Sequence, residues 1–515
     1  MPAEKDRKLY IIGIDAAPLW IIRNYLKKAD LEGFSEIMKE GALIDMESTL
    51  PPMTGPSWPS IYTGFRPGQH GVPEFLKMEP DYTRSVVYYD PGIKPPFWES
   101  IAQKGFRSLV MTPAMLVRTP TSRNIDMITG FPLPPKFSSN SIKEAADRHD
   151  FKGEPEIEAE MKNGELPIEE ASNIYKEGIR KRAEVSKDLM DANDYNLSFI
   201  CFTETDRMQH FSLNKKNWAS CVVPLYEEIS KFLKWTERRA KKEGATVMVI
   251  SDHGAQPIKK MFLMNGWLMK EGYSKFKKEI EEGLNERSQG MAIKYKLREQ
   301  ILRSVHRSGS RKAIYDKLPR VGKRMARAIL ANSLSGTSGV NYNRIHDFDY
   351  EMSKTKAFAN IANCPVTTIY INDGRFTHGS VKAAEKLALK KRIMRDLMNI
   401  KDEKGKPLII NVWDGDEYYE GTKLFIAPDI MAQAEEGYLL ESFGFLKDGN
   451  LFMEPEMPKS GDHLRNGIFG VVSYGNKIDC SKIARKKLYV YNVQPTVMHY
   501  FGMASKNDKR YGPVF

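Results

Sequence analysis

The stretch ATVMVISDHG, Ala245–Gly254, indicates the class of fold that this chain adopts. Ala245–Ser251 is a continuous apolar run rich in β-branched side chains, which is typical of a strand buried on both faces of a sheet. The run ends at Asp252 and His253, and Gly254 lets the backbone turn sharply after them. Two adjacent side chains of the metal-ligand type at the end of a buried strand predict a functional site there.

Strand-like and helix-like segments alternate along the chain. They occupy, in order, Leu9–Asp15, Phe106–Ala114, Ile168–Asp191, Leu197–Thr203 and Val222–Glu243. This alternation predicts an α/β fold with a central, mostly parallel sheet that is covered on both faces. In such sheets ligands bind beyond the carboxyl ends of the strands. Pro132–Pro167 is polar and interrupted by prolines, and we interpret it as a surface loop or lid.

Composition favours a globular protein. The 515 residues are 41% hydrophobic and 28% charged, and no run approaches the roughly 18 apolar residues of a membrane span. The four cysteines are scattered without CxxC spacing, which argues against a disulfide framework. The first apolar segment is too short for a signal peptide with its cleavage site. These features predict a cytoplasmic protein.

The net charge of +12 is concentrated in one segment. Residues 291–330 hold twelve Lys or Arg against two acidic residues, which is a net charge of +10. The surrounding sequence, 259–345, is basic and helix-forming. We interpret it as a helical insertion or cap that interrupts a core made of residues 1–258 and 346–515.

Four interpretations are open for the basic segment 291–330. It is a solvated helical face, a cap that attracts an anionic substrate, a surface that docks on an anionic membrane, or a nucleic-acid contact. A partial apolar stripe opposite the charges is compatible with membrane docking. Nucleic acid ranks last, because a single-strand stacking platform needs more aromatic side chains than Tyr295 and Tyr315.

Six candidate metal ligands stand at four places in the sequence: Asp15, Asp206, His210, Asp252, His253 and His463. Asp206 and His210 are four residues apart and share a face if a helix begins there. Each place alone also has an ordinary structural interpretation, such as an N-cap aspartate or a solvated histidine. Together the mixed Asp and His set suits Zn²⁺ or Mn²⁺ rather than Ca²⁺, and pairs of such ions assist hydrolysis of phosphate esters.

Thr54 is the candidate nucleophile. It lies in PPMTGPS, Pro51–Ser57, where Pro56 suits the first turn of a helix whose free N–H groups would face an anion. A threonine hydroxyl is a poor nucleophile at neutral pH, and a bound metal would lower its pKa. The alternative is a plain threonine N-cap.

The motifs that contain these residues resemble the alkaline phosphatase superfamily, in its type I phosphodiesterase/nucleotide pyrophosphatase branch. The similarity is greatest to a microbial group of predicted phosphohydrolases and phosphomutases. The matching motifs are IIGIDA (Ile11–Ala16), LPPMTGPSWPSIYTGFRPGQHGV (Leu50–Val72), TDRMQHF (Thr205–Phe211), VISDHGA (Val249–Ala255) and SGDHLRNGIFGV (Ser460–Val471). They follow the expected order and span nearly the whole chain.

The resemblance implies an alkaline-phosphatase-like three-layer sandwich with an inserted helical cap. It also implies two metal ions, Zn²⁺ ahead of Mn²⁺, and a phospho-threonine formed on Thr54. One metal would be held by Asp15, Asp252 and His253, and the other by Asp206, His210 and His463. Gly55 and Ser57 are the implied phosphate contacts, with Ser57 standing where the nucleotide pyrophosphatases carry an asparagine.

The expected function is therefore cleavage of a phosphodiester or pyrophosphate bond in a small-molecule phosphoester, such as a nucleotide or nucleotide sugar. The arginine and third-metal features of the monoester-cleaving relatives are not recognisable, which favours diesters. Phosphomutase and phosphomonoesterase activity are alternatives within the same chemistry. A different alternative is a protein that binds an anionic ligand or membrane surface through residues 291–330.

Overall fold

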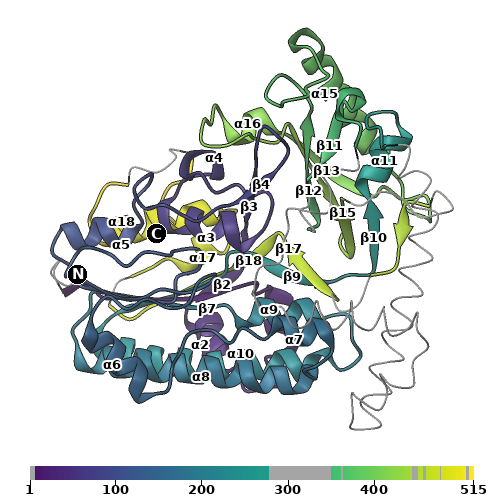
Figure 1. The fold of residues 1–515 in the computed structure, drawn as a ribbon. Coiled ribbons are helices and arrows are strands. Elements are labelled where there is room, and N and C mark those ends of the chain that lie inside the picture. Colours follow the sequence, from purple (N-terminus) through teal and green to yellow (C-terminus); the bar gives the residue numbers. More distant parts are fainter. Residues whose placement is uncertain are drawn as a thin grey trace, which may run out of the picture.

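The computed structural model describes residues 6–277, 350–360, 364–442, 450–455, 460–475, 477–505 and 510–515. Within them the chain forms a large unit around an eight-stranded sheet and a small unit that contains sheets of four and three strands (Figure 1). None of the described helices is both long and apolar enough to span a bilayer. Residues 278–349 lie outside the described residues, and with them most of the predicted insertion 259–345 and the whole basic segment 291–330.

The large sheet has the strand order β19–β2–β18–β8–β1–β7–β5–β6. In that order the strands are Leu488–Tyr489, Ala42–Glu47, Asn466–Ser473, Thr246–Ile250, Leu9–Ile14, Leu197–Phe202, Ser108–Met111 and Ile125–Ile128. β1 is parallel to its neighbours β7 and β8, and β5 is parallel to β6 and β7. β18 is antiparallel to β8 and β2. The prediction of a mostly parallel sheet is confirmed.

Both faces of this sheet are buried, because alternate side chains of a strand point into different layers. Tyr10, Ile12 and Ile14 of β1 belong to the core on one face, whereas Leu9 and Ile11 belong to the core on the other. A strand with two apolar faces has no polar alternation, which is why these strands read as continuous apolar runs.

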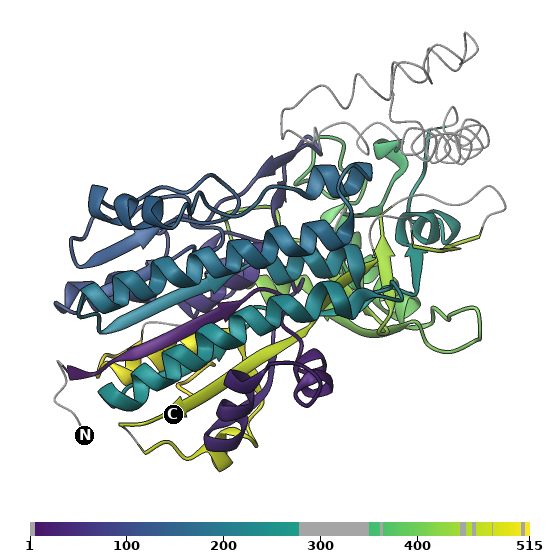
Figure 2. The ribbon, with the colours of Figure 1, turned by 90° about the horizontal axis from the view of Figure 1, so that it is seen from below.

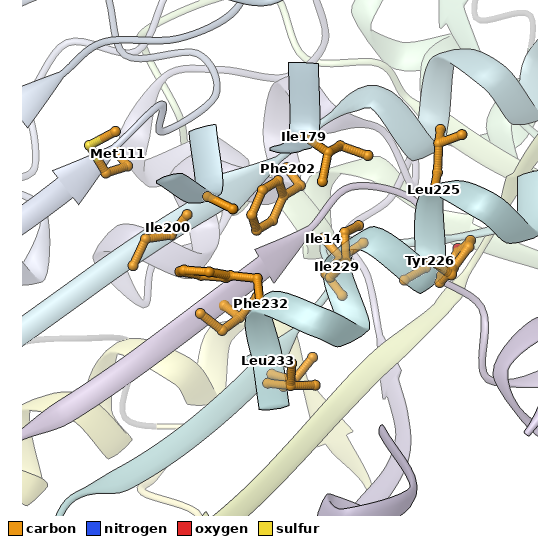
Figure 3. Close-up of a cluster of buried hydrophobic side chains, with 14 of the residues drawn as sticks. Ile14, Met111, Ile179, Ile200, Phe202, Leu225, Tyr226, Ile229, Phe232 and Leu233 are labelled. Atoms are coloured by element: carbon orange, nitrogen blue, oxygen red, sulfur yellow. The ribbon is translucent and has the colours of Figure 1, made fainter. Parts of the chain in front are cut away.

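The first face is covered by α1 (Leu19–Tyr25), α2 (Glu32–Glu40), α6 (Asn140–Arg148), α7 (Glu158–Asn163), α8 (Ile168–Ala192), α9 (Glu204–Ser212) and α10 (Trp218–Glu243). The long helices α8 and α10 run side by side along the sheet (Figure 2). Figure 3 shows Ile14 and Phe202 of the sheet among Ile179 of α8 and Leu225 and Ile229 of α10.

The second face is covered by α3 (Thr54–Thr63), α5 (Phe97–Gln103), α17 (Cys480–Ile483), the 3-10 helix η4 (Val490–Asn492) and α18 (Val493–Tyr500). The short helix α4 (Pro67–His70) follows α3, and the hairpin β3 (Leu76–Met78) and β4 (Arg84–Val86) follows α4. The predicted three-layer architecture is confirmed.

The loop predicted for Pro132–Pro167 is wrong in part, because α6 and α7 form within it. Helix α6 is capped by Ser139, whose hydroxyl accepts a hydrogen bond from Ile142 N, and it buries Ile142 and Ala145 against the sheet. The prolines that suggested a loop all lie outside the two helices.

The small unit contains β11 (Ala357–Ala359), β12 (Val366–Ile371), β14 (Ile430–Ala434) and β13 (Ile409–Asp414) in one sheet, and β15 (Tyr438–Glu441), β10 (Lys260–Leu263) and β16 (Phe452–Met453) in the other. Its helices are α11 (Met264–Lys270), the 3-10 helix η3 (Met352–Lys354), α15 (Ala383–Met398) and α16 (Gly415–Tyr419). A two-stranded ribbon of β9 (Gly254–Pro257) and β17 (Gly461–Leu464) lies where the two units meet (Figure 1). The first described part of the predicted insertion, 259–277, is thus β10 and α11 of this unit.

A buried polar cluster joins the two units. Glu74, which follows α4, accepts hydrogen bonds from Asn360 Nδ2 and Thr368 Oγ1 of the small unit, both at 2.9 Å. Arg84 Nε donates to Asn360 Oδ1 at 2.7 Å. Burial raises the pKa of Glu74 to about 7, against the opposing effects of Thr368, Arg84 and Asn360. Glu74 therefore keeps its proton in the folded protein at pH values where it ionises in the unfolded chain.

We expect this cluster to lose stability as the pH rises. The ordinary glutamate pKa is 4.5, so the stabilising proton is fully present below pH 4.5 and is lost as the pH passes about 7. The loss amounts to roughly 3 kcal/mol of unfolding free energy. Glu74→Gln is neutral at every pH and should flatten this dependence in urea unfolding measured between about pH 5 and pH 8. Glu436→Gln, at an exposed carboxylate of the small unit, should keep the wild-type dependence, and equal slopes for wild type and Glu74→Gln would contradict the prediction.

Candidate active site

Three aspartates stand at the carboxyl ends of three adjacent parallel strands. Asp15 follows β1, Asp206 lies in the first turn of the helix after β7, and Asp252 follows β8. The backbone ties two of these ends together, because Asp15 N donates to Phe202 O at 2.8 Å and Thr205 Oγ1 donates to Asp15 O at 2.6 Å. The topology of the sheet therefore gathers residues that are far apart in the sequence.

Thr54 lies within the first group of candidate ligands. Thr54 Oγ1 donates to Asp15 Oδ1 at 3.3 Å and is 3.4 Å from His253 Nε2. His253 Nε2 is 3.5 Å from Asp15 Oδ1 and 3.2 Å from Asp252 Oδ2. All four residues are buried. The structure thus brings the candidate nucleophile together with the three residues predicted to hold one metal.

Asp206, His210 and His463 form the second group. His210 Nε2 is 3.3 Å from Asp206 Oδ1 and 3.1 Å from His463 Nε2, and His463 Nε2 is 3.6 Å from Asp206 Oδ1. Asp206 and His210 share a face of α9, while His463 comes from β17, paired with β9 directly after His253. Ligand atoms of Asp206, Asp15 and His253 also lie within 4.8 Å of one another. Asp206 therefore belongs to both groups, although the sequence motifs assign it to one.

The backbone fixes the orientation of two imidazoles. His210 Nδ1 donates to Gly461 O at 2.9 Å, and His253 Nδ1 donates to Gly254 O at 3.0 Å. A carbonyl only accepts, so both Nδ1 atoms carry a proton, and in the neutral ring Nε2 then keeps its lone pair. These are the backbone contacts that orient histidine ligands in metal sites.

The three aspartates repel one another in a buried site. Burial raises the pKa of Asp15, and the nearby Asp252 and Asp206 raise it further. Burial likewise raises the pKa of Asp252, to about 6. Burial also opposes ionisation of Asp206, but His210, His463 and His253 outweigh it and lower its pKa.

This donor set fits divalent cations. Among the described residues no lysine or arginine pairs with Asp15, Asp206 or Asp252, whose ionic partners are histidines. In this site carboxylates and Nε2 lone pairs converge without a cationic side chain. A bound metal ion would neutralise the negative charge of such carboxylates.

The turn that carries Thr54 is tightly packed. Thr54 is the first residue of α3 and Pro56 lies in the first turn, as predicted. A Cβ on Gly55 would lie 3.2 Å from the carbonyl carbon of Glu74, so the backbone there passes close to a neighbouring segment. Ser57 Oγ makes hydrogen bonds with Ser48 Oγ at 2.8 Å and Thr49 Oγ1 at 2.7 Å. The described bonds of Ser57 thus hold the turn, and the phosphate contacts predicted for Gly55 and Ser57 stay predictions.

Trp58 contributes to the site in a way that sequence reasoning missed. Its Nε1 donates to Asp15 Oδ2 at 3.2 Å while its ring is fully buried against the sheet. The spacing of four residues from Thr54 on one helix was the available signal, since it places both side chains on one face.

The match to protein families decides the classification. Residues 9–443 match the model of the type I phosphodiesterase/nucleotide pyrophosphatase family. The chain belongs to this family. The predicted membership in this branch of the alkaline phosphatase superfamily is confirmed, and it makes the protein a hydrolase of phosphoesters. His463 lies beyond the matched residues of this phosphodiesterase-family protein, and the pairing of β17 with β9 is what brings it to the site.

Two solved structures of a phosphonoacetate hydrolase support the fold. Phosphonoacetate hydrolase from Sinorhizobium meliloti 1021 in complex with phosphonoformate is similar, with a TM-score of 0.54 and 14% identity over 95% of this chain and 94% of that one. Its complex with phosphonoacetate gives a TM-score of 0.52 with the same identity and coverage. Murine ectonucleotide pyrophosphatase/phosphodiesterase 5 gives a TM-score of 0.46 and 13% identity over 97% of this chain and 96% of that one. The comparison with curated proteins found no match.

Proposed function

We propose that this phosphodiesterase-family protein cleaves a phosphodiester or pyrophosphate bond through a phospho-threonine on Thr54, with two divalent metal ions held by the two ligand groups. The observation that carries the proposal is the position of Thr54 Oγ1, 3.3 Å from Asp15 Oδ1 and 3.4 Å from His253 Nε2. Zn²⁺ is the first choice and Mn²⁺ the second, because the ligands mix carboxylates with imidazoles.

Thr54 supplies the attacking oxygen in this proposal. Its Oγ1 bonds to phosphorus as the bond from phosphorus to the leaving oxygen breaks, and the leaving oxygen departs with the electron pair and is protonated by water. The Thr54 proton leaves toward Asp15 Oδ1, which already accepts its hydrogen bond, and passes on to water. The start of α3 directs free backbone N–H groups toward the transferred phosphoryl group. When bound, the two cations would lower the pKa of the hydroxyl and neutralise charge on the phosphoryl oxygens. Water then hydrolyses the phospho-threonine and restores the hydroxyl.

The substrate class that we propose is a small phosphodiester or pyrophosphate, with nucleotides and nucleotide sugars as the first compounds to test. A monoester carries two negative charges and a diester only one. In the described part of the chain no arginine bonds to Thr54 or to the three aspartates, so the described residues supply little fixed positive charge there beyond the metals. A site with little positive charge beyond the metals stabilises the singly charged diester better than the doubly charged monoester.

Metal removal provides the test. After treatment with a chelator the protein should not hydrolyse bis-p-nitrophenyl phosphate, and added Zn²⁺ or Mn²⁺ should restore hydrolysis, because the ligand groups have no cationic side chain to replace the metals. The restored enzyme should prefer this diester to p-nitrophenyl phosphate. Preference for the monoester would replace the proposal with a phosphomonoesterase, and an isomerised sugar phosphate without free phosphate would indicate a phosphomutase. Full activity after exhaustive chelation would contradict the two-metal proposal.

A further inference from the structure

The residues that lead to the nucleophile form a short connection between β2 and α3. We call this segment, Ser48–Met53, the nucleophile strap. Pro51 and Pro52 have no N–H group, so the N–H of Leu50 is the last backbone donor before Met53. On the inner side, Ser57 bonds to the first two residues of the strap, and Thr49 Oγ1 donates to Pro51 O at 2.7 Å.

Two consecutive tyrosines of the small unit hold the strap from the outer side. Leu50 N donates to Tyr418 Oη at 2.8 Å, and Tyr419 Oη donates to Leu50 O at 3.2 Å. Both polar backbone groups of Leu50 are therefore bound by side chains from the end of α16. Tyr418 Oη is in turn hydrogen-bonded to Tyr491 Oη at 2.6 Å, which links it to the helical layer under α3.

The tyrosines are themselves fixed by packing. Leu50, Met53 and Tyr419 share one buried apolar cluster with Val366 of β12 and Met431 of β14. A Cβ on Gly68 would lie 2.3 Å from the Tyr419 carbonyl oxygen, so α16 sits directly against α4. Helix α16 therefore contacts both the strap and α4. Because of these contacts, we expect the strap to move only together with the small unit.

We propose that Tyr418 and Tyr419 are positioning residues for the nucleophile. They hold Leu50 so that the strap delivers Thr54 Oγ1 to its place beside Asp15 and His253. The inference rests on the proposed function, in which Thr54 attacks phosphorus. It adds that the small unit, through α16, sets the alignment of a nucleophile that belongs to the large unit.

This role predicts a particular kinetic pattern. A displacement of a reacting group by about 1 Å is enough to cost roughly 100-fold in rate, whereas the metals and the substrate surface stay in place. Loss of a tyrosine hydroxyl should therefore lower kcat and leave KM and the metal content unchanged. It should slow transfer of the phosphoryl group to Thr54 more than hydrolysis of the phospho-threonine, since water and not Thr54 is the attacking group in the second step.

The experiment compares Tyr418→Phe with Tyr491→Phe, each in the full chain loaded with Zn²⁺. Tyr418→Phe removes the hydroxyl that accepts the hydrogen bond from Leu50 N. Tyr491→Phe removes the other hydroxyl of the Tyr418–Tyr491 hydrogen bond and leaves the bond to Leu50 N intact. For bis-p-nitrophenyl phosphate we expect Tyr418→Phe to lower kcat roughly tenfold or more with KM within about twofold, and Tyr491→Phe to change neither by more than about twofold. Rapid-quench measurement of phospho-Thr54 should show slower formation in Tyr418→Phe only.

Tyr419→Phe provides a second, independent variant if Tyr418→Phe does not fold. It removes the donor to Leu50 O on the other side of the same residue and should reproduce the kcat defect. Wild-type kcat in folded Tyr418→Phe and Tyr419→Phe would overturn the inference, as would equal defects in Tyr418→Phe and Tyr491→Phe. Absence of phospho-Thr54 in the wild type would instead overturn the proposed function, so the two failures are distinguishable.

Discussion

Thr54→Ala is expected to abolish turnover of bis-p-nitrophenyl phosphate, with a loss in kcat of roughly 10³-fold or more, while the protein keeps both metals. The hydroxyl is the attacking atom in the proposed mechanism, and its hydrogen-bond partners Asp15 and His253 serve there as candidate metal ligands. The six proposed ligands are unchanged in this variant, so metal content by elemental analysis should equal that of the wild type. No phosphorylated peptide containing residue 54 should be found after acid quenching.

Two other variants control for indirect effects. Thr54→Ser keeps a hydroxyl at the same place and should retain part of the activity. Thr63→Ala removes a buried threonine hydroxyl from the last residue of the same helix, where it bonds only to Pro59 O and the backbone N of Phe65 in the described structure, and should behave as the wild type. If Thr54→Ala keeps wild-type turnover, water attacks the substrate directly and the covalent proposal is wrong.

The gathering of the aspartates could be predicted from the sequence alone. Asp15 and Asp252 follow continuous apolar runs, and Asp206 follows another a few residues on. Runs of this kind, alternating with helices, predict parallel strands whose carboxyl ends share one edge of the sheet. This inference needs only local periodicity and a general topological rule, which is why it succeeded without knowledge of any tertiary contact.

His463 and Ser57 mark the limit of that approach. His463 reaches the site through the antiparallel pairing of β17 with β9, and nothing in the local sequence of either short strand specifies the other as its partner. The family motif implies a phosphate contact for Ser57, which stays a prediction, and it gives no indication of the hydrogen bonds that Ser57 makes with Ser48 and Thr49. Side-chain direction within a crowded turn depends on the neighbouring segments, and periodicity carries no information on it.

The contact of α16 with the nucleophile strap likewise could not be predicted from the sequence. In the sequence, Tyr418 and Tyr419 resemble ordinary aromatic residues that fill a core. Their hydrogen bonds to the backbone of Leu50 form only because the large unit folds against the small one. Long-range contacts between units follow from the packing of whole layers, not from the pattern within one segment. For the same reason Asp206 was assigned to one ligand group, whereas the folded chain brings it to both.

The position of Asp206 in both candidate ligand groups leads to the second prediction. Asp206→Asn removes a carboxylate that lies near Asp15 and His253 as well as near His210 and His463. An amide is a weaker ligand and carries no charge, so both ions should bind more weakly. We expect Asp206→Asn to lower the content of both metals and to reduce kcat for bis-p-nitrophenyl phosphate by roughly 10³-fold. His463→Ala removes a ligand from the second group only and should retain about one metal per chain after the same dialysis.

The difference between these two variants is what tests the shared position of Asp206. A residue that binds one ion affects the other ion only indirectly, through charge. Since His463→Ala removes a proposed ligand of one ion only, excess Zn²⁺ should restore its activity more readily than that of Asp206→Asn. A matched substitution at Asp45, an exposed carboxylate of β2 that belongs to neither group, should leave metal content and activity unchanged. If Asp206→Asn and His463→Ala lose the same single ion, Asp206 serves one metal alone, as the sequence motifs implied, and its closeness to Asp15 reflects only the crowding of the strand ends.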